Sequence, residues 1–124
     1  MNIKTIVSIL SVLAVAAGCS TDPKQSLEDL NMPIIQTKYT ADPSPMIYKD
    51  TLFLYTSHDE DDGENFHMKD WLLYTTTDMV NWQDRGAVAG LRNFKWYRNT
   101  NGAWAQQVVE RNGKFYMYCP IHGN

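Results

Sequence analysis

The chain has 124 residues, of which 44% are hydrophobic and 12% aromatic, which is enough apolar material for a folded core. The 11 Lys and Arg residues are outnumbered by 14 Asp and Glu residues, giving a formal net charge of −3 at pH 7. This mildly acidic balance, without a basic cluster, argues against a nucleic-acid partner.

The first residues have the pattern of a secretory signal. Lys4 supplies a positive charge, and the apolar run 6–17 spans about a dozen residues, the length of a signal-peptide hydrophobic region. A membrane span would take about 20 apolar residues. The run leads to Ala-Ala-Gly-Cys, ending at Cys19, which resembles a bacterial lipoprotein processing site whose cysteine is acylated and becomes the mature N-terminus. The alternative is an ordinary secretory signal with a chance cysteine.

These features divide the chain into a lipoprotein signal peptide at residues 1–18, a polar tether at 19–33 and a folded part at 34–124. Ser20 follows the cysteine, so an aspartate signal for retention in the inner membrane is absent there. We therefore expect a protein of the cell envelope that is anchored through the lipid on Cys19. The expected location is the outer membrane, with the folded part on its periplasmic or surface face.

The folded part contains an internal repeat. Residues 42–55 and 105–118 align at a constant offset without a gap. Each copy predicts a strand, a tight turn at 49–50 or 112–113, and a second strand. Asp42 opens the first copy, and the second copy has alanine at the same place.

The repeat predicts an all-β fold. Strands are expected at 46–48, 52–57, 71–76 and 82–88, with Asp78 in a turn before the last of them. Four short antiparallel strands repeated at a period somewhat above forty residues are typical of a β-propeller blade. The segment 34–124 would then hold the first blade and the start of the second.

A propeller closes with typically 4–8 blades, so we expect this chain to be a fragment or truncated reading frame of a longer protein. The alternative is a small independent β-domain. In a fragment, apolar blade faces would be left open to water, and four residues are expected to lie on such faces: Leu52, Leu54, Tyr116 and Tyr118.

Four ordered motifs resemble glycoside hydrolase family 43, in its arabinofuranosidase and xylosidase branch. They are Tyr-Thr-Ala-Asp-Pro-Ser-Pro at 39–45, Leu-Tyr-Thr-Ser-His-Asp at 54–59, Thr-Asp-Met-Val-Asn-Trp at 77–82 and Asn-Gly-Ala-Trp-Ala at 101–105. The resemblance covers nearly all of the chain beyond the tether and implies a five-bladed β-propeller. One departure is Gln106, where the family usually has a proline that sets the entry of an inner strand.

By this resemblance, Asp42 corresponds to the catalytic general base of an inverting glycosidase. Such enzymes place a carboxylate base and a carboxylic acid on opposite faces of the sugar, about 6.5–9.5 Å apart. Without the repeat and the family motifs, an Asp before a Pro is better explained as a turn residue. In the family the proton donor and the aspartate that tunes its pKa come from the third and fourth blades. Glu110, within the second hairpin, is interpreted as a solvated strand charge.

Three further residues are predicted to bind substrate. Trp104 starts the inner strand of the second blade, where an indole can stack on a sugar ring. Packing between blades is the alternative for Trp104 and the expectation for the other tryptophans, Trp71, Trp82 and Trp96. His58 and Asp59 end the second strand and are predicted to rim the same pocket.

The acidic run 59–64 does not predict a calcium loop, since His58 and Lys69 stand where an EF-hand needs acids. We expect no metal or other cofactor in this segment, although the resemblance allows an axial calcium in a complete propeller. Cys119, in an apolar strand, is expected to be a buried, inert thiol.

Three functions remain compatible with the sequence. The first is a lipid-anchored hydrolase of O-glycosyl bonds in plant cell-wall polysaccharides such as xylan, with arabinose- or xylose-containing glycans as partners. On this interpretation the chain alone would be inactive. The second is a non-catalytic glycan-binding surface lipoprotein. The third is a five-bladed glycosidase acting on fructans, which the Ala-Asp-Pro-Ser-Pro motif ending at Pro45 does not match.

Overall fold

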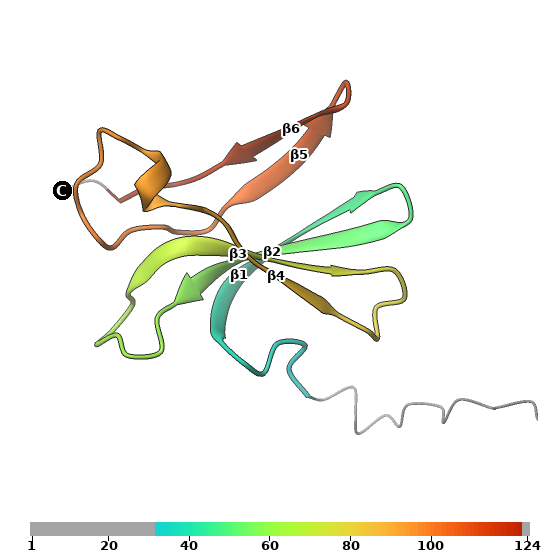
Figure 1. Cartoon of the computed structure of the whole chain (residues 1–124), viewed down its shortest axis with the longest axis horizontal. Helices are drawn as coiled ribbons and strands as arrows, with labels where there is room; N and C mark the ends of the chain where they lie inside the picture. Colours follow the sequence, from blue (N-terminus) through green and yellow to red (C-terminus); the bar gives the residue numbers. More distant parts are fainter. Residues whose placement is uncertain (1–31, 123–124) are drawn as a thin grey trace, which may run out of the picture. The chain divides into compact units, whose positions relative to one another are not determined.

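The computed structural model describes residues 32–122. The predicted signal peptide, the lipidation site Cys19 and most of the tether lie outside this range. Four strands form one antiparallel sheet in chain order: β1 Tyr39–Tyr48, β2 Thr51–Asp59, β3 Met68–Thr76 and β4 Gln83–Gly90 (Figure 1). The four-stranded blade expected from the sequence is therefore confirmed.

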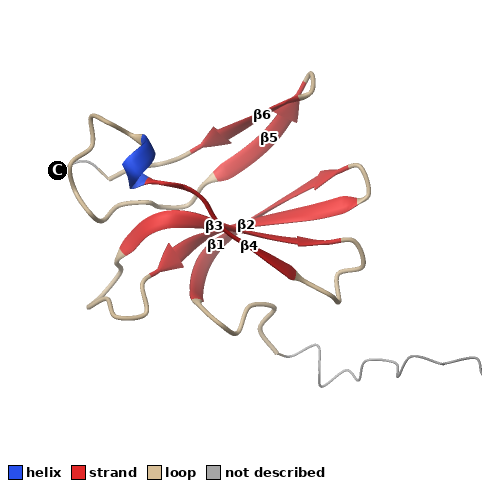
Figure 2. Ribbon diagram, viewed as in Figure 1, coloured by secondary structure: helices blue, strands red, loops and turns tan. Residues whose placement is uncertain are grey.

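A second, smaller sheet follows the blade. A single 3₁₀ turn, η2 Leu91–Asn93, leads to the antiparallel hairpin β5 Gln107–Arg111 and β6 Lys114–Tyr118 (Figure 2). This hairpin is the second copy of the sequence repeat. In the described part of the chain, no helix is long and apolar enough to cross a bilayer.

The strands of the blade extend beyond their predicted ends. β1 begins at Tyr39 rather than at residue 46, and β3 begins at Met68 rather than at residue 71. The sequence does not predict the start of the first strand, because prolines stand at 43 and 45 and proline is uncommon inside sheets. Proline is tolerated here because β1 is an edge strand of its sheet.

Local turn chemistry explains where the strands reverse. Asn112 and Gly113 have φ values of 56° and 73°, which is the left-handed pair of a type I′ hairpin turn. Between β3 and β4, the Asp78 carboxylate accepts hydrogen bonds from the backbone N–H groups of Val80 and Asn81 at 2.9 and 2.8 Å. The turn role predicted for Asp78 is therefore confirmed.

The two faces of the blade are covered by different apolar clusters. Trp71 and Leu72 are neighbours on β3, so their side chains point to opposite faces of the sheet. Leu72 packs with Leu54 and Tyr74, and the partly buried Trp82 lies against them. Trp71 packs with three buried residues on the other face: Met68, Leu91 and Ala103.

The Trp71 cluster joins the blade to the second hairpin. Ala103 forms an isolated antiparallel bridge with Ile121, and the half-buried residues Met117 and Cys119 pack on the same cluster. Burial raises the pKa of the Cys119 thiol, in agreement with the expected inert state. At the far end, the rings of Tyr48 and Phe115 meet edge to face at 5.0 Å.

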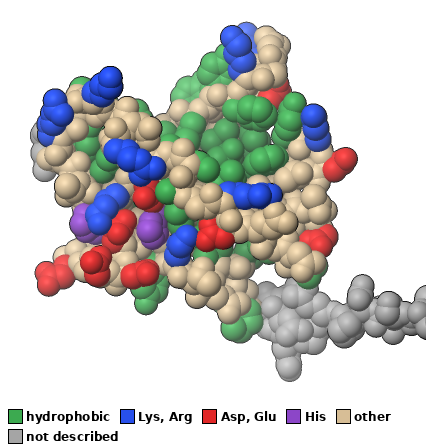
Figure 3. Space-filling view, in the orientation of Figure 1, with side chains coloured by type: hydrophobic (Ala, Val, Ile, Leu, Met, Phe, Trp, Pro, Cys, Tyr) green, Lys and Arg blue, Asp and Glu red, His purple; other side chains and the backbone are tan. Residues whose placement is uncertain are grey.

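Two expectations about exposed side chains are wrong. Leu54 is 8% exposed because it is covered by the Leu72 cluster, and Trp96 is 69% exposed instead of packed between blades. The expectation holds for Tyr116 and Tyr118, which are 43% and 63% exposed. Figure 3 shows apolar side chains on the surface between the β5–β6 hairpin and the sheet.

Candidate active site

Asp42 lies in a bulge of β1. Ala41 pairs with Ser57 and Ser44 pairs with Tyr55, so two residues of β1, Asp42 and Pro43, oppose one residue of β2. Proline suits this place because it has no N–H to leave unpaired. Bulges redirect a side chain and are over-represented next to active sites.

The backbone of Asp42 is unusual for a strand residue. Its φ of 52° lies in the left-handed region, which only a few per cent of non-glycine residues adopt. Within residues 32–122, the other non-glycine residues with positive φ lie in turns or loops: Lys49, Asn65, Met79 and Asn112. Strained conformations inside regular structure concentrate at functional sites, so the geometry points to a role for Asp42 beyond turn formation.

A hydrogen bond orients the carboxylate of Asp42. The hydroxyl of Ser57 donates to Asp42 Oδ2 at 2.9 Å, and Ser57 itself is fully buried. The Asp42 residue remains exposed to solvent. One carboxylate oxygen is thus held by the protein while the side chain stays accessible, as a base that activates water requires.

Trp104 is placed on the same side of the blade. The indole N–H of Trp71 donates to the carbonyl oxygen of Trp104 at 2.7 Å, and Trp71 pairs in register with Ser57. Ala41, the neighbour of Asp42, packs on the same cluster as Trp104. The structure therefore brings the predicted base and the predicted sugar platform to one face of the blade.

Trp104 is half-buried, and it borders a cavity of about 270 Å³. Asn101, Gly102, Tyr97 and His122 also line it. The Tyr97 hydroxyl donates to the carbonyl oxygen of Asn101 at 2.6 Å and also contacts the carbonyl oxygen of His122. A glycine is required at position 102, because its φ is 122° and a Cβ there would lie 2.6 Å from the Tyr97 hydroxyl.

Gln106 replaces the proline of the family pattern in a buried position. It is 4% exposed, and neither its Oε1 nor its Nε2 has a hydrogen-bond partner among the described residues. A buried amide without partners is destabilising by about 1–3 kcal/mol. The segment 102–106 forms only the Ala103 bridge instead of a continuous strand, whereas the matching part of the first copy belongs to β1.

His58 and Asp59 are engaged in contacts away from Asp42. His58 follows Ser57 on β2, so its side chain leaves the opposite face, where its Nδ1 lies 2.9 Å from Asp70 Oδ1. Asp59 accepts a hydrogen bond from the backbone N–H of His67 at 2.9 Å. The role of both residues at a pocket rim stays a prediction.

Sequence reasoning missed the partners in these contacts. Ser57 and Asp70 carry no motif that signals pairing with Asp42 and His58, because both pairs form between strands and depend on the strand register. His58, Asp70 and Glu60 form a group of possible metal ligands whose spacing in the sequence does not match an EF-hand loop.

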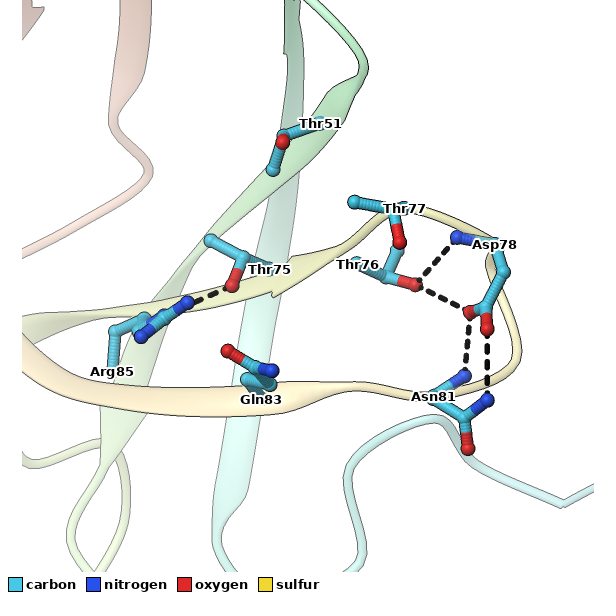
Figure 4. Close-up of a pocket in the computed structure, with 8 residues that line it drawn as sticks. All are labelled: Thr51, Thr75, Thr76, Thr77, Asp78, Asn81, Gln83 and Arg85. Atoms are coloured by element: carbon cyan, nitrogen blue, oxygen red, sulfur yellow. Dashed lines mark hydrogen bonds between the residues drawn. The ribbon is translucent and has the colours of Figure 1, made fainter.

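A second cavity, of about 220 Å³, lies beside the β3–β4 turn (Figure 4). Its wall is polar, with Thr76, Asp78, Asn81 and Arg85 among its residues. These side chains bond to one another or to the turn: Asn81 Nδ2 donates to Asp78 Oδ2 at 2.8 Å, and Arg85 Nε donates to Thr75 at 3.0 Å. Their polar groups already have partners, which fits a structural role.

The axial calcium allowed by the resemblance finds no ligand group on the described inner strands. Asp42 is the one carboxylate on β1, and Ser57 already donates to it. Glu110 is the one carboxylate on β5, and it accepts a hydrogen bond from the N–H of Gly113 in the hairpin turn.

The sequence of the chain is similar to those of known proteins. The sequence model described as "Glycosyl hydrolases family 43" matches residues 30–124. A xylosidase/arabinosidase of Bacteroides ovatus is 32% identical over 97 residues, which cover 71% of this chain and 29% of the relative. Xylosidase/arabinosidase 43A of Humicola insolens is 29% identical over 98 residues, with the same coverage of both chains.

The solved structures give the same result for the fold. The GH43_1 enzyme from Xanthomonas citri, complexed with xylotriose, superposes with a TM-score of 0.65 at 34% identity. The match covers 73% of this chain and 27% of that enzyme, so the chain spans less than a third of the length of its relatives. A match over most of the chain in both sequence and fold shows that this protein belongs to glycosyl hydrolases family 43.

Proposed function

We propose that this chain supplies the first blade and the general base of an inverting glycosidase that releases xylose or arabinose from plant cell-wall glycans. The observation that carries this proposal is Asp42, held at a φ of 52° in a bulge and bonded to Ser57. The xylosidase/arabinosidase relatives and the xylotriose complex of the Xanthomonas citri enzyme support the choice of sugars.

In this proposal each site residue has one task. Asp42 removes a proton from the water that attacks the anomeric carbon, while Ser57 keeps the carboxylate in place. The indole of Trp104 stacks on the sugar ring and closes one side of the pocket. The proton donor belongs to the region of the relatives that this chain does not span, and the chain alone is therefore inactive.

The proposal includes lipid anchoring. Cys19 follows a signal-like apolar run, and acylation would hold the blade at the cell envelope, at the outer membrane. An envelope location suits a hydrolase whose polymeric substrates stay outside the cell. A single acyl chain gives marginal membrane binding, so stable anchoring requires a second membrane-binding signal.

A chimera tests the catalytic part of the proposal. Residues 34–122 would replace the matching segment of the Bacteroides ovatus xylosidase/arabinosidase. The remainder of the chimera would be the sequence of that relative. We expect hydrolysis of aryl xylosides or arabinosides, reduced by about 10²–10⁴-fold by Asp42→Asn. Asp50→Asn, at the exposed β1–β2 turn, is the matched control and should leave the rate unchanged.

The outcomes separate the alternatives. A folded chimera whose Asp42→Asn variant keeps the full rate would contradict the assignment of the base. Binding of xylo-oligosaccharides without any hydrolysis would favour the glycan-binding lipoprotein instead. Turnover by the isolated chain that is lost in Asp42→Asn would show that this segment already holds both carboxylates.

A further inference from the structure

Three side chains that can ligate a metal converge on the face of the blade opposite Asp42. His58 Nδ1 lies 2.9 Å from Asp70 Oδ1 and 3.7 Å from Glu60 Oε1. The ligand atoms of the three residues all lie within 4.8 Å of one another. The side chains are mostly buried, with exposed fractions of 16%, 19% and 18% for His58, Glu60 and Asp70.

The fold determines this convergence. Ser57 pairs with Trp71 in the antiparallel register of β2 and β3, so the next residue, His58, lies beside Asp70 across the strand pair. Glu60 follows directly after β2, and its backbone N–H donates to the carbonyl oxygen of His67 at 2.9 Å. That bond closes the loop and fixes the main chain from which the Glu60 side chain extends.

Neighbouring charges leave one oxygen of Glu60 available. Lys69 Nζ donates to Glu60 Oε2 at 3.1 Å, so Oε1 is the oxygen that faces His58. The surrounding loop 59–64 is rich in acids (Figure 3), and these exposed carboxylates make the region attractive to cations. Lys69 offsets only part of this negative charge.

We propose that His58, Glu60 and Asp70 form a binding site for a divalent transition-metal ion, with Zn²⁺ as the expected occupant. Zinc bonds to nitrogen and oxygen ligands are about 2.0–2.2 Å long, so two ligands of one tetrahedral ion lie roughly 3.3–3.6 Å apart. The distances from His58 Nδ1 to Asp70 Oδ1 and Glu60 Oε1, 2.9 and 3.7 Å, bracket that range. Small rotations of these side chains would bring both pairs into it. Water would complete the coordination.

The ligand types favour zinc over calcium. Calcium takes 6–8 oxygen ligands, whereas an imidazole with two carboxylates suits zinc. His58 Nδ1 and Asp70 Oδ1 lie within hydrogen-bond distance, and because an ionised carboxylate can only accept, this bond is made when Nδ1 carries the imidazole proton. Metal binding requires Nδ1 to be free, so the neutral ring must carry its proton on Nε2 in the bound state. The bound ion would then connect Glu60, in the loop between β2 and β3, to His58 on β2 and Asp70 on β3.

Calorimetric titration tests the site. The full chain with Cys19→Ser would be treated with a chelator, exchanged into buffer at neutral pH and titrated with ZnCl₂. We expect binding of one Zn²⁺ per chain, weakened at least about tenfold by His58→Gln or Asp70→Asn. The control is His67→Gln, in the same loop but outside the ligand group, and it should bind as the parent does.

A second measurement guards against misfolded variants. Asp70→Asn keeps the size of the side chain, and its circular dichroism spectrum should match that of the parent. Zn²⁺ should raise the thermal midpoint of the parent and not that of Asp70→Asn. No Zn²⁺ binding, equal binding by parent and Asp70→Asn, or binding of Ca²⁺ in place of Zn²⁺ would each overturn the proposal.

Discussion

Trp71 connects the blade to the second hairpin, and Trp71→Phe tests that connection. The side chain is completely buried, and its N–H donates to the carbonyl oxygen of Trp104 at 2.7 Å. It packs on Met68 and Ala103 and meets the ring of Phe94 edge to face at 6.3 Å. Phenylalanine keeps an aromatic ring in this place and removes the hydrogen bond and part of the volume.

Two losses add up in the expected effect. Removing the hydrogen bond costs about 1 kcal/mol. If the smaller ring buries about 40 Å² less apolar surface, about 1 kcal/mol more is lost at roughly 25 cal/mol per Å². The total loss of unfolding free energy is therefore about 2 kcal/mol, or about 10 °C in the thermal midpoint of a domain of this size. Any cavity left by the indole would increase the effect.

Urea denaturation followed by far-ultraviolet circular dichroism measures the change, since tryptophan fluorescence would itself be altered by the substitution. The matched control is Trp96→Phe, because Trp96 is 69% exposed. Its unfolding free energy should stay within about 0.5 kcal/mol of the parent. If Trp71→Phe were no more destabilising than Trp96→Phe, the inferred role of Trp71 between the two sheets would be refuted.

Three further predictions concern other parts of the chain. Cys19→Ser should abolish incorporation of a radioactive fatty acid in a bacterial host, and an unlabelled parent chain would contradict the lipoprotein signal. Hydrogen bonds from Asn81 hold the pKa of the Asp78 carboxyl below its usual range. The ionised carboxylate therefore contributes fully to the free energy of unfolding above the unfolded pKa of about 3.9, and this contribution is lost as the pH falls towards the folded pKa. The urea midpoint of Asp78→Asn should therefore fall less than that of the parent between pH 7 and pH 2.5, and equal falls would count against this explanation. Gln106→Met should raise the unfolding free energy by about 1 kcal/mol, because it removes a buried amide without hydrogen-bond partners. The control Gln107→Met, at an exposed position, should not raise it. A lower unfolding free energy for Gln106→Met would mean that the amide has a partner.

Local chemistry allowed the sequence to predict most of the fold. Turns such as Asn112-Gly113 depend on backbone preferences of the residues themselves, and so does the turn in which Asp78 accepts backbone hydrogen bonds. The strands between turns are short and rich in aromatic and β-branched residues. The repeat of one hairpin then indicated blades and drew attention to Asp42, where the two copies differ.

Contacts across strands were decided by the tertiary structure alone. The bulge at Asp42 and the register of β2 with β3 determine which side chains meet, and a shift of one residue would move each to the other face. Neither the bulge nor the register has a clear sequence signal. The pairing of Ser57 with Asp42 and the grouping of His58 with Asp70 were therefore visible only in the folded chain.

Burial of the tryptophans shows the same division. Packing between blades is expected from the sequence for both Trp71 and Trp96, yet Trp71 is completely buried and Trp96 is largely exposed. Which tryptophan is buried depends on where the second hairpin packs on the blade. Trp71, for example, is hydrogen-bonded to Trp104, which lies 33 positions further along the chain. Sequence patterns of this chain thus determine its strands and turns, while the packing of blade on hairpin decides which side chains form the core and the site.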